Sequence, residues 1–114
     1  MSDLTEKKCL PCEGGVLPFD ISEIHKYQKK VDGWDLTKDN KEVFFLSKKF
    51  NFDNFLESQK FVNEVGKISE EEGHHPDISF GWGYAKIKIT THAIEGLSEN
   101  DFILAAKIDK IISV

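Results

Sequence analysis

Histidine is the residue type in this sequence that is best suited to chemistry, and three of the four histidines lie close together, at His74, His75 and His92. An imidazole accepts or donates a proton near neutral pH, so the cluster is a candidate for general acid–base catalysis. Pro76 favours extended backbone angles at His75, and neighbouring side chains of an extended loop point to opposite sides. One imidazole can then bind a ligand while the next one moves protons. On residue types alone, three exposed histidines without a function are an equally good interpretation.

A metal site is a weaker interpretation of the same region. Adjacent histidines lack the one-turn spacing of a helical zinc-binding pair, and no third ligand follows at a familiar interval. Cys9 and Cys12 supply half of a zinc or redox site, but the sequence contains no second pair. A thioredoxin-like motif would lie between a strand and a helix, whereas these cysteines lie in a segment punctuated by Pro and Gly. We therefore expect no metal, and a structural or incidental role for the cysteines.

The elements that must position the histidines begin after residue 18. Residues 1–18 are predicted to form an extended arm, and residues 19–114 a single domain. Three segments with apolar residues at helical spacing predict helices. Their expected N-caps are Ser22, Asp53 and Ser98, and the first two helices are expected to end near Val31 and at Gly73.

Four segments with alternating apolar and polar residues predict strands, at residues 34–37, 42–50, 78–82 and 85–90. His92 is expected to continue the polar face of the last strand. The predicted order is α-β-β-α-β-β-α with two hairpins. This order favours an α+β domain, in which a four-stranded antiparallel sheet carries three helices on one face.

Several polar or aromatic residues near the histidines have a structural explanation. Ser98 and Asp101 fit a capping box at the start of the last helix, and Leu97 and Phe102 fit the hydrophobic staple around it. A tryptophan such as Trp82 is more often part of a core than a ligand platform. The glutamates at 70, 71 and 72 are expected on the solvated face of the second helix.

The bulk properties exclude some classes of partner. The 114-residue chain carries a formal net charge of −5, and its pI is near 5.3. This acidic balance argues against nucleic acid or an anionic membrane as the main partner. The sequence shows no apolar run long enough to span a membrane and no apolar leader, so we expect a cytoplasmic protein.

Apolar side chains on both sides of one predicted strand indicate an interface between copies of the chain. Val43 and Phe45 would face one side of residues 42–50, while Phe44 and Leu46 would face the other. The last helix also carries more isoleucines than a narrow core stripe needs, at Ile103, Ile108, Ile111 and Ile112. We therefore expect a homo-oligomer.

The residues around the histidines resemble the signature of the pterin-4a-carbinolamine dehydratase family. The resemblance rests on Glu70-Glu71-Glu72-Gly73-His74-His75-Pro76, followed by Trp82, His92 and Asp101 at the family's intervals. It implies the family's fold, which has the same order of elements, and active-site roles for His74, His75 and His92. It also implies a substrate site formed by Glu70, Pro76, Trp82, Thr90, Thr91 and Asp101. The sequence differs from common members at Trp82, where a tyrosine is frequent, and at Gly73, where some relatives carry an aspartate that could orient His74.

The resemblance further implies a lyase that dehydrates 4a-hydroxytetrahydropterin to the quinonoid dihydropterin. Such a reaction recycles the tetrahydropterin that an aromatic amino acid hydroxylase consumes. A base must take a proton from the ring, and an acid must protonate the departing hydroxyl. We assign these two transfers to His74 and His92, in an order that the residues leave open, and substrate orientation to His75. This chemistry requires no cofactor, and members of the family are homodimers or homotetramers.

Two other functions stay open at this point. Animal members of the family also act as dimerisation partners of a transcription factor, so the chain could be a binding module. It could also act on another pterin, such as one linked to molybdenum cofactor. A binding module needs no histidine cluster, so the presence of all three histidines favours the enzyme.

Overall fold

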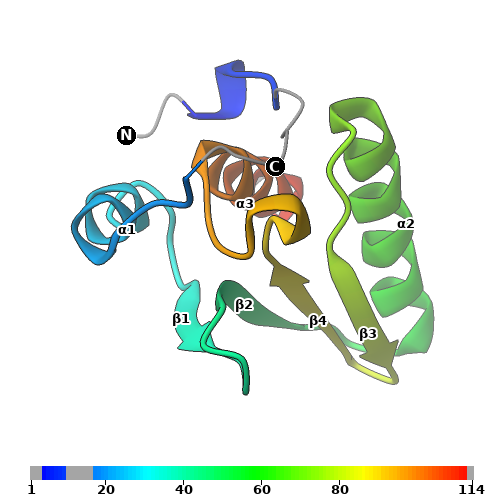
Figure 1. The fold of residues 1–114 in the computed structure, drawn as a ribbon. Coiled ribbons are helices and arrows are strands. Elements are labelled where there is room, and N and C mark those ends of the chain that lie inside the picture. The colour runs from blue at the N-terminus through cyan, green and yellow to red at the C-terminus, as the bar shows by residue number, and fades with distance from the viewer. Residues whose placement is uncertain (1–3, 10–16, 113–114) are drawn as a thin grey trace.

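The computed structural model describes residues 4–9 and 17–112 (Figure 1). The helices are α1 (Ile21–Gln28), α2 (Phe55–Glu72) and α3 (Glu99–Ile112). The strands are β1 (Asp35–Lys38), β2 (Phe44–Asn51), β3 (Asp77–Gly81) and β4 (Tyr84–Ile89). Two short 3-10 helices are η1 (Leu4–Glu6) and η2 (His92–Ile94). Within these residues, no helix has the length and apolar character that crossing a membrane requires. The predicted order of the three helices and four strands is confirmed.

The four strands form one antiparallel sheet in the spatial order β1-β2-β4-β3. Strands β2 and β4 are therefore central, and α2 makes the connection between β2 and the edge strand β3. The helices lie on one side of the sheet, and its other side is open (Figure 1). The predicted α+β architecture, a four-stranded antiparallel sheet with three helices on one face, is confirmed.

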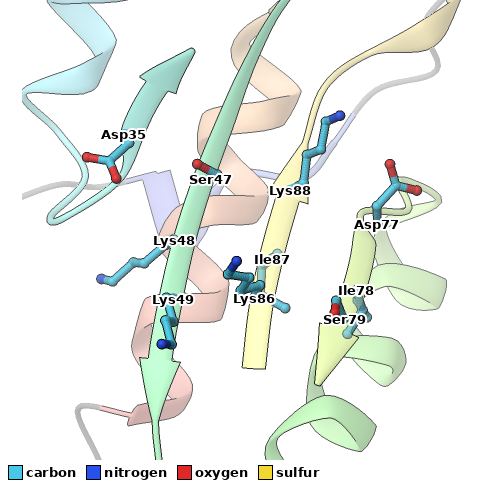
Figure 2. Close-up of a pocket in the computed structure, with 10 residues that line it drawn as sticks. All are labelled: Asp35, Ser47, Lys48, Lys49, Asp77, Ile78, Ser79, Lys86, Ile87 and Lys88. Carbon is cyan, nitrogen blue, oxygen red and sulfur yellow. The ribbon is translucent and has the colours of Figure 1, made fainter. Parts of the chain in front are cut away.

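The alternation along β4 explains which face of the sheet is covered. Ala85, Ile87 and Ile89 are buried in one apolar cluster with the side chains of α3. Lys86 and Lys88 alternate with them and project on the open face (Figure 2). Full burial of an isoleucine side chain such as Ile87 or Ile89 contributes about 1.5–3 kcal/mol to folding, so the cluster fixes the register of β4.

The predicted starts of the first two helices are wrong by small amounts. Helix α1 is capped by Asp20, whose carboxylate accepts the N–H of Glu23, and not by Ser22. Helix α2 is capped by Asn54 and not by Asp53. In both places two residues within two positions of each other are good N-caps, so residue type alone does not decide which one takes the position. The end of α1 is also earlier than predicted, at Gln28.

The predicted strands are right in number and order, and their ends are shifted by one or two residues. Trp82 lies in the turn between β3 and β4, because Gly83 adopts a φ of 82° and closes that turn. Strand β4 ends at Ile89, so Thr90 and Thr91 lie beyond it. The expectation that His92 continues the strand is wrong, since His92 opens η2.

The described part of the predicted arm is folded onto the helices rather than extended. Residues 4–6 form η1, and the side chain of Leu4 is completely buried in the core. This contact covers a side of α3 that the sheet does not reach, and it explains part of the surplus of isoleucines, since Ile103 and Ile108 are buried within the chain. Residues 10–16, including Cys12, lie outside the described residues.

Candidate active site

The three clustered histidines line one depression of about 280 Å³ where four elements meet. These elements are the end of α2, the end of β4, η2 and the first turn of α3. The lining residues are Gly73, His74, His75, Thr90, Thr91, His92, Ala93 and Asn100. The fold thus brings together five of the residues that the sequence predicted for the site.

Sharp changes of chain direction place the histidines at this depression. Gly73 ends α2 in the left-handed conformation with a φ of 66°, and the N–H of His74 donates to the Ser69 carbonyl. The chain then leaves the helix axis and enters β3 after Pro76. On the other side, two backbone hydrogen bonds between Thr91 and Gly96 close a loop that contains η2 and carries His92.

His74 is held by a buried carboxylate. Its Nε2 lies 2.7 Å from Oδ1 of Asp101, a residue with no exposed surface. The other oxygen, Oδ2, accepts the Thr91 hydroxyl at 2.7 Å and the Ser98 N–H at 2.8 Å. The last contact is half of the predicted capping box, so Asp101 caps α3 and orients His74 at once.

This contact determines which nitrogen of His74 is available for chemistry. A carboxylate accepts hydrogen bonds and does not donate them, so the imidazole proton is assigned to Nε2. Nδ1 is then the nitrogen that is free to accept a proton. The aspartate that some relatives carry at the position of Gly73 is therefore not needed to orient His74.

The other two histidines have much looser surroundings. The Nε2 of His75 pairs with Glu70, and both side chains are mostly exposed to solvent, so the pair restrains His75 only weakly. His92 is exposed in η2, and its ring has no hydrogen-bond partner among the described residues. Both imidazoles can therefore turn toward a bound molecule.

The hydroxyls of Thr90 and Thr91 stabilise the walls of the depression and are not free to donate to a bound molecule. The hydroxyl of Thr90 donates to the Phe44 carbonyl at 2.8 Å, which ties the end of β4 to β2. The hydroxyl of Thr91 donates to Asp101. Both residues are buried and line the depression, and their hydroxyls are engaged within the protein, so a role in binding the pterin stays a prediction.

The remaining predicted residues lie around or away from the depression. Glu70 reaches it only through His75, and Pro76 forms the connection to β3. Trp82 lies in the turn at the opposite end of the β3–β4 hairpin and is 70% exposed. Within one chain, Trp82 does not line the depression.

Sequence reasoning missed one residue that lines the depression and one that lies beside it. Asn100 is buried in the first turn of α3 and lines the depression. Glu72 was expected in solvent, but its side chain is only 8% exposed and lies 2.5 Å from the Lys107 ammonium. Its place two residues before His74 was visible in the sequence, whereas its partners come from distant parts of the chain.

A second depression, of about 420 Å³, lies on the open face of the sheet (Figure 2). Lys49 and Lys86 face each other there across β2 and β4, and no carboxylate in the described part of the chain forms an ion pair with either. None of the predicted site residues lines it. We therefore place the candidate active site at the histidines, where titratable groups and a positioned carboxylate converge.

The residues that could hold a metal are not gathered together. In residues 4–9 and 17–112, no three His, Cys, Asp or Glu side chains approach one another closely enough to bind one ion. Burial, and secondarily the charge of Glu72, raises the pKa of the Cys9 thiol to about 12. Cys9 is therefore a neutral thiol at physiological pH, whereas zinc binding and redox chemistry use a thiolate.

The fold and the site define a small α+β domain with a histidine–aspartate pair suited to proton transfer. The sequence profile of the family described as Pterin 4 alpha carbinolamine dehydratase matches residues 18–111. The chain therefore belongs to the pterin-4a-carbinolamine dehydratase family, which is a family of hydro-lyases.

Individual relatives agree with this assignment over nearly the whole chain. A candidate pterin-4-alpha-carbinolamine dehydratase of Rubrobacter xylanophilus is 46% identical over 111 residues, which cover 97% of this chain and 100% of the relative. A protein of the same description from Halorhodospira halophila is 47% identical over 108 residues, which cover 95% of this chain and 96% of the relative. The resemblance recognised in the motif is therefore confirmed.

Two solved structures share the fold. One is described as a transcriptional coactivator/pterin dehydratase from Brucella melitensis, with a TM-score of 0.73 and 23% identity over 82% of this chain and 97% of that one. The other is described as a pterin dehydratase-like protein that is a RuBisCO assembly factor in the alpha-carboxysome. It has a TM-score of 0.59 and 26% identity, and the match covers 69% of this chain and 88% of that one. They confirm the architecture independently of the motif.

Proposed function

We propose that this chain removes water from a 4a-hydroxytetrahydropterin and releases the quinonoid dihydropterin. The single observation that carries the proposal is the convergence of His74, His75 and His92 on one depression, with His74 held against the buried Asp101. In the reaction, N5 loses a proton and the C4a hydroxyl leaves with a proton as water. A double bond forms between C4a and N5. The protein must supply one base and one acid.

The surroundings of each histidine support separate roles. His74 is fixed by Asp101 and keeps Nδ1 free, as a group that moves a proton at a defined place requires. His92 is exposed and lines the same depression as His74, so its ring is proposed to complete the acid–base pair. His75, weakly restrained by Glu70, is proposed to bind and orient the pterin. Proton transfer of this kind is typically worth about 10²–10⁴ in rate.

The proposed substrate suggests a place in metabolism. A 4a-hydroxytetrahydropterin is the product that an aromatic amino acid hydroxylase releases from its cofactor, and the dehydrated pterin can be reduced again. The proposed role is therefore recycling of tetrahydropterin in the cytoplasm, beside such a hydroxylase. The reaction uses no cofactor in this proposal, because breaking the C4a–O bond and forming the C4a–N5 double bond require only proton transfers from the protein and no change of oxidation state.

The proposal is tested by the dehydration of a chemically generated carbinolamine, followed by absorbance, with and without the purified chain. Catalysis predicts a rate well above that of the buffer, proportional to protein concentration. His25→Ala is a matched control, since His25 is an exposed histidine of α1 and should leave the rate unchanged. A rate equal to that of the buffer would rule the function out.

A binding function is the second candidate, and the open face of the sheet is the observation in its favour. Lys49 and Lys86 lie opposite each other there without an acidic partner in the described chain, and like charges directly opposite are unfavourable. A pure binding module would not accelerate dehydration and would be indifferent to substitution of the histidines. An enzyme for another pterin, such as one linked to molybdenum cofactor, would instead prefer that pterin in the same assay.

A further inference from the structure

The contact between His74 and Asp101 joins two elements that are otherwise separate. His74 follows the last turn of α2, and Asp101 lies in the first turn of α3. The 2.7 Å distance between them therefore depends on how these two helix ends are held relative to each other. The residues that hold them come from the N-terminal segment Leu4–Cys9.

The segment Leu4–Cys9 binds both helix ends. On α2, the Lys8 ammonium donates to the Glu71 carbonyl at 2.8 Å, and the Cys9 N–H donates to Glu72 at 2.8 Å. On α3, the Cys9 thiol donates to the Asn100 carbonyl at 3.5 Å. Asn100 immediately precedes Asp101, and Glu72 lies two residues before His74. Cys9 thus bridges the two helix ends beside the candidate site.

The carboxylate of Glu72 is the centre of this bridge. Its Oε1 accepts the Cys9 N–H, and its Oε2 accepts the Lys107 ammonium of α3 at 2.5 Å. Burial alone would raise the pKa of Glu72, but the hydrogen bonds from Lys107 and Cys9 outweigh it, and the pKa lies below its ordinary value. The carboxylate is therefore ionised at neutral pH and holds three segments of the chain together.

We propose that Glu72 is a positioning residue for the reaction, acting with Cys9 and Lys107 as a clamp that sets His74 against Asp101. The inference rests on the proposed function, because it assigns the clamp to the same site. It gives the N-terminal segment a role that neither the motif nor the depression requires. The side chain of Glu72 does not line the depression, so it acts only through His74.

The test compares Glu72→Gln with Glu71→Gln in the full chain. Glutamine keeps the size of Glu72 but removes the charge that binds Lys107, so the helix ends loosen. Because a displacement of about 1 Å can cost up to 10²-fold in rate, we expect kcat to fall about tenfold or more, with KM changed less than about twofold. Glu71 has an exposed side chain, and Glu71→Gln should leave both constants unchanged.

A second pair of variants tests the contribution of the N-terminal segment. Cys9→Pro removes the N–H that Glu72 accepts, whereas Cys9→Ser retains it. We expect Cys9→Pro to lower kcat as Glu72→Gln does, and Cys9→Ser to change it less than about threefold. Equal effects of the two substitutions would contradict a role for this hydrogen bond.

Two further measurements distinguish the loss of the clamp from a loss of stability alone. Trp34→Phe removes a hydrogen bond to Asp109 near the far end of α3, and it supplies a variant destabilised away from the site. If the two variants have similar melting temperatures, the clamp predicts a lower kcat for Glu72→Gln than for Trp34→Phe. It also predicts that the ¹⁵N resonances of the His74 ring move toward those of the exposed His25 in Glu72→Gln.

The ring resonances need no enzymatic activity, so they separate the two proposals. A wild-type chain without dehydratase activity would overturn the proposed function, while a shifted His74 signal in Glu72→Gln would still support the clamp. An unchanged His74 signal together with unchanged kcat would overturn the clamp and leave the dehydratase intact. A kcat loss matched by Trp34→Phe would also overturn it.

Discussion

At the scale of single residues, the site depends on one buried carboxylate with two duties. Asp101 accepts the N–H of Ser98 and so starts α3, and the same group faces the His74 ring. Ser98 and His74 contact different oxygens of this carboxylate, so a role of Asp101 in the capping box leaves its predicted role at the site possible. Because each oxygen is already engaged, the carboxylate cannot move without releasing a helix end, which keeps the imidazole in place.

Asp101→Asn tests this duty directly. The amide can still accept the Ser98 N–H, but its NH₂ group can donate to His74 and so stabilise the tautomer with the proton on Nδ1. We expect kcat for carbinolamine dehydration to fall about 10²-fold or more, with a smaller change in KM. An Asp101→Asn variant with wild-type turnover would show that orientation of His74 by the carboxylate is unimportant.

Residue types alone identified the three histidines and could not assign their surroundings. His74 and Asp101 are distant in sequence, and their contact follows from the left-handed turn at Gly73 together with the start of α3. The buried state of Glu72 was missed for a related reason. A run of three glutamates at a helix end is usually solvated, and only the partners Cys9 and Lys107 make burial of one of them favourable.

At the scale of elements, the spacing of apolar residues along the sequence predicted the helices and strands but not the residues at which the helices begin. Four alternating segments, of which residues 85–89 are the clearest, and three segments with an apolar face at helical spacing predicted the sheet and the helices that cover it. The N-cap of α2 was misplaced by one residue, because Asp53 and Asn54 are almost equally good caps. The N-terminal segment was also misjudged, since burial of only Leu4 and Cys9 among residues 4–9 leaves no periodic pattern to detect.

The position of the α2 cap gives a stability prediction. Asn54 accepts the N–H of Glu57 at 2.9 Å, so Asn54→Ala should lower the free energy of unfolding by about 1 kcal/mol. Asp53→Ala is the matched control and should change it by less than about 0.5 kcal/mol, because Asp53 lies outside the helix. Urea unfolding of the two variants measures the difference. A larger loss of unfolding free energy in Asp53→Ala than in Asn54→Ala would show that Asp53 is the N-cap of α2.

At the scale of the whole molecule, the exposed apolar side chains support the prediction of a homodimer or homotetramer. Phe55 and Phe80 are in ring contact at 5.5 Å and are 46% and 36% exposed. Trp82, in the turn after β3, is 70% exposed. Strand β3 is an edge of the sheet, and exposed edges beside apolar side chains are usually covered.

Light scattering at micromolar concentration should therefore give a mass that is at least about twice the 13.0 kDa of one chain. Trp82→Glu should shift the distribution toward the monomer, since a charge at an apolar contact is unfavourable. Ile21→Glu is the control, as Ile21 is also exposed but lies on α1. A wild-type monomer with full activity would show that these side chains tolerate solvent.

Metal independence is a second prediction for the whole molecule. The adjacent histidines lack ligand spacing, and the Cys9 thiol is protonated at neutral pH because its pKa is raised to about 12. Exhaustive treatment with a chelator should therefore leave both the dehydration rate and the melting temperature unchanged. Loss of activity that zinc restores would reveal a metal site that includes residues beyond those described.

Acid–base catalysis by His74 and His92 is tested most directly by the turnover numbers of three variants in the carbinolamine dehydration assay. His74→Ala and His92→Ala should each lower kcat by about 10²-fold or more, because each removes one half of the acid–base pair. His75→Ala should mainly raise KM, and the control His25→Ala should match the wild type. Equal losses of about tenfold or less in all three site variants would contradict the assignment of proton transfer to these histidines.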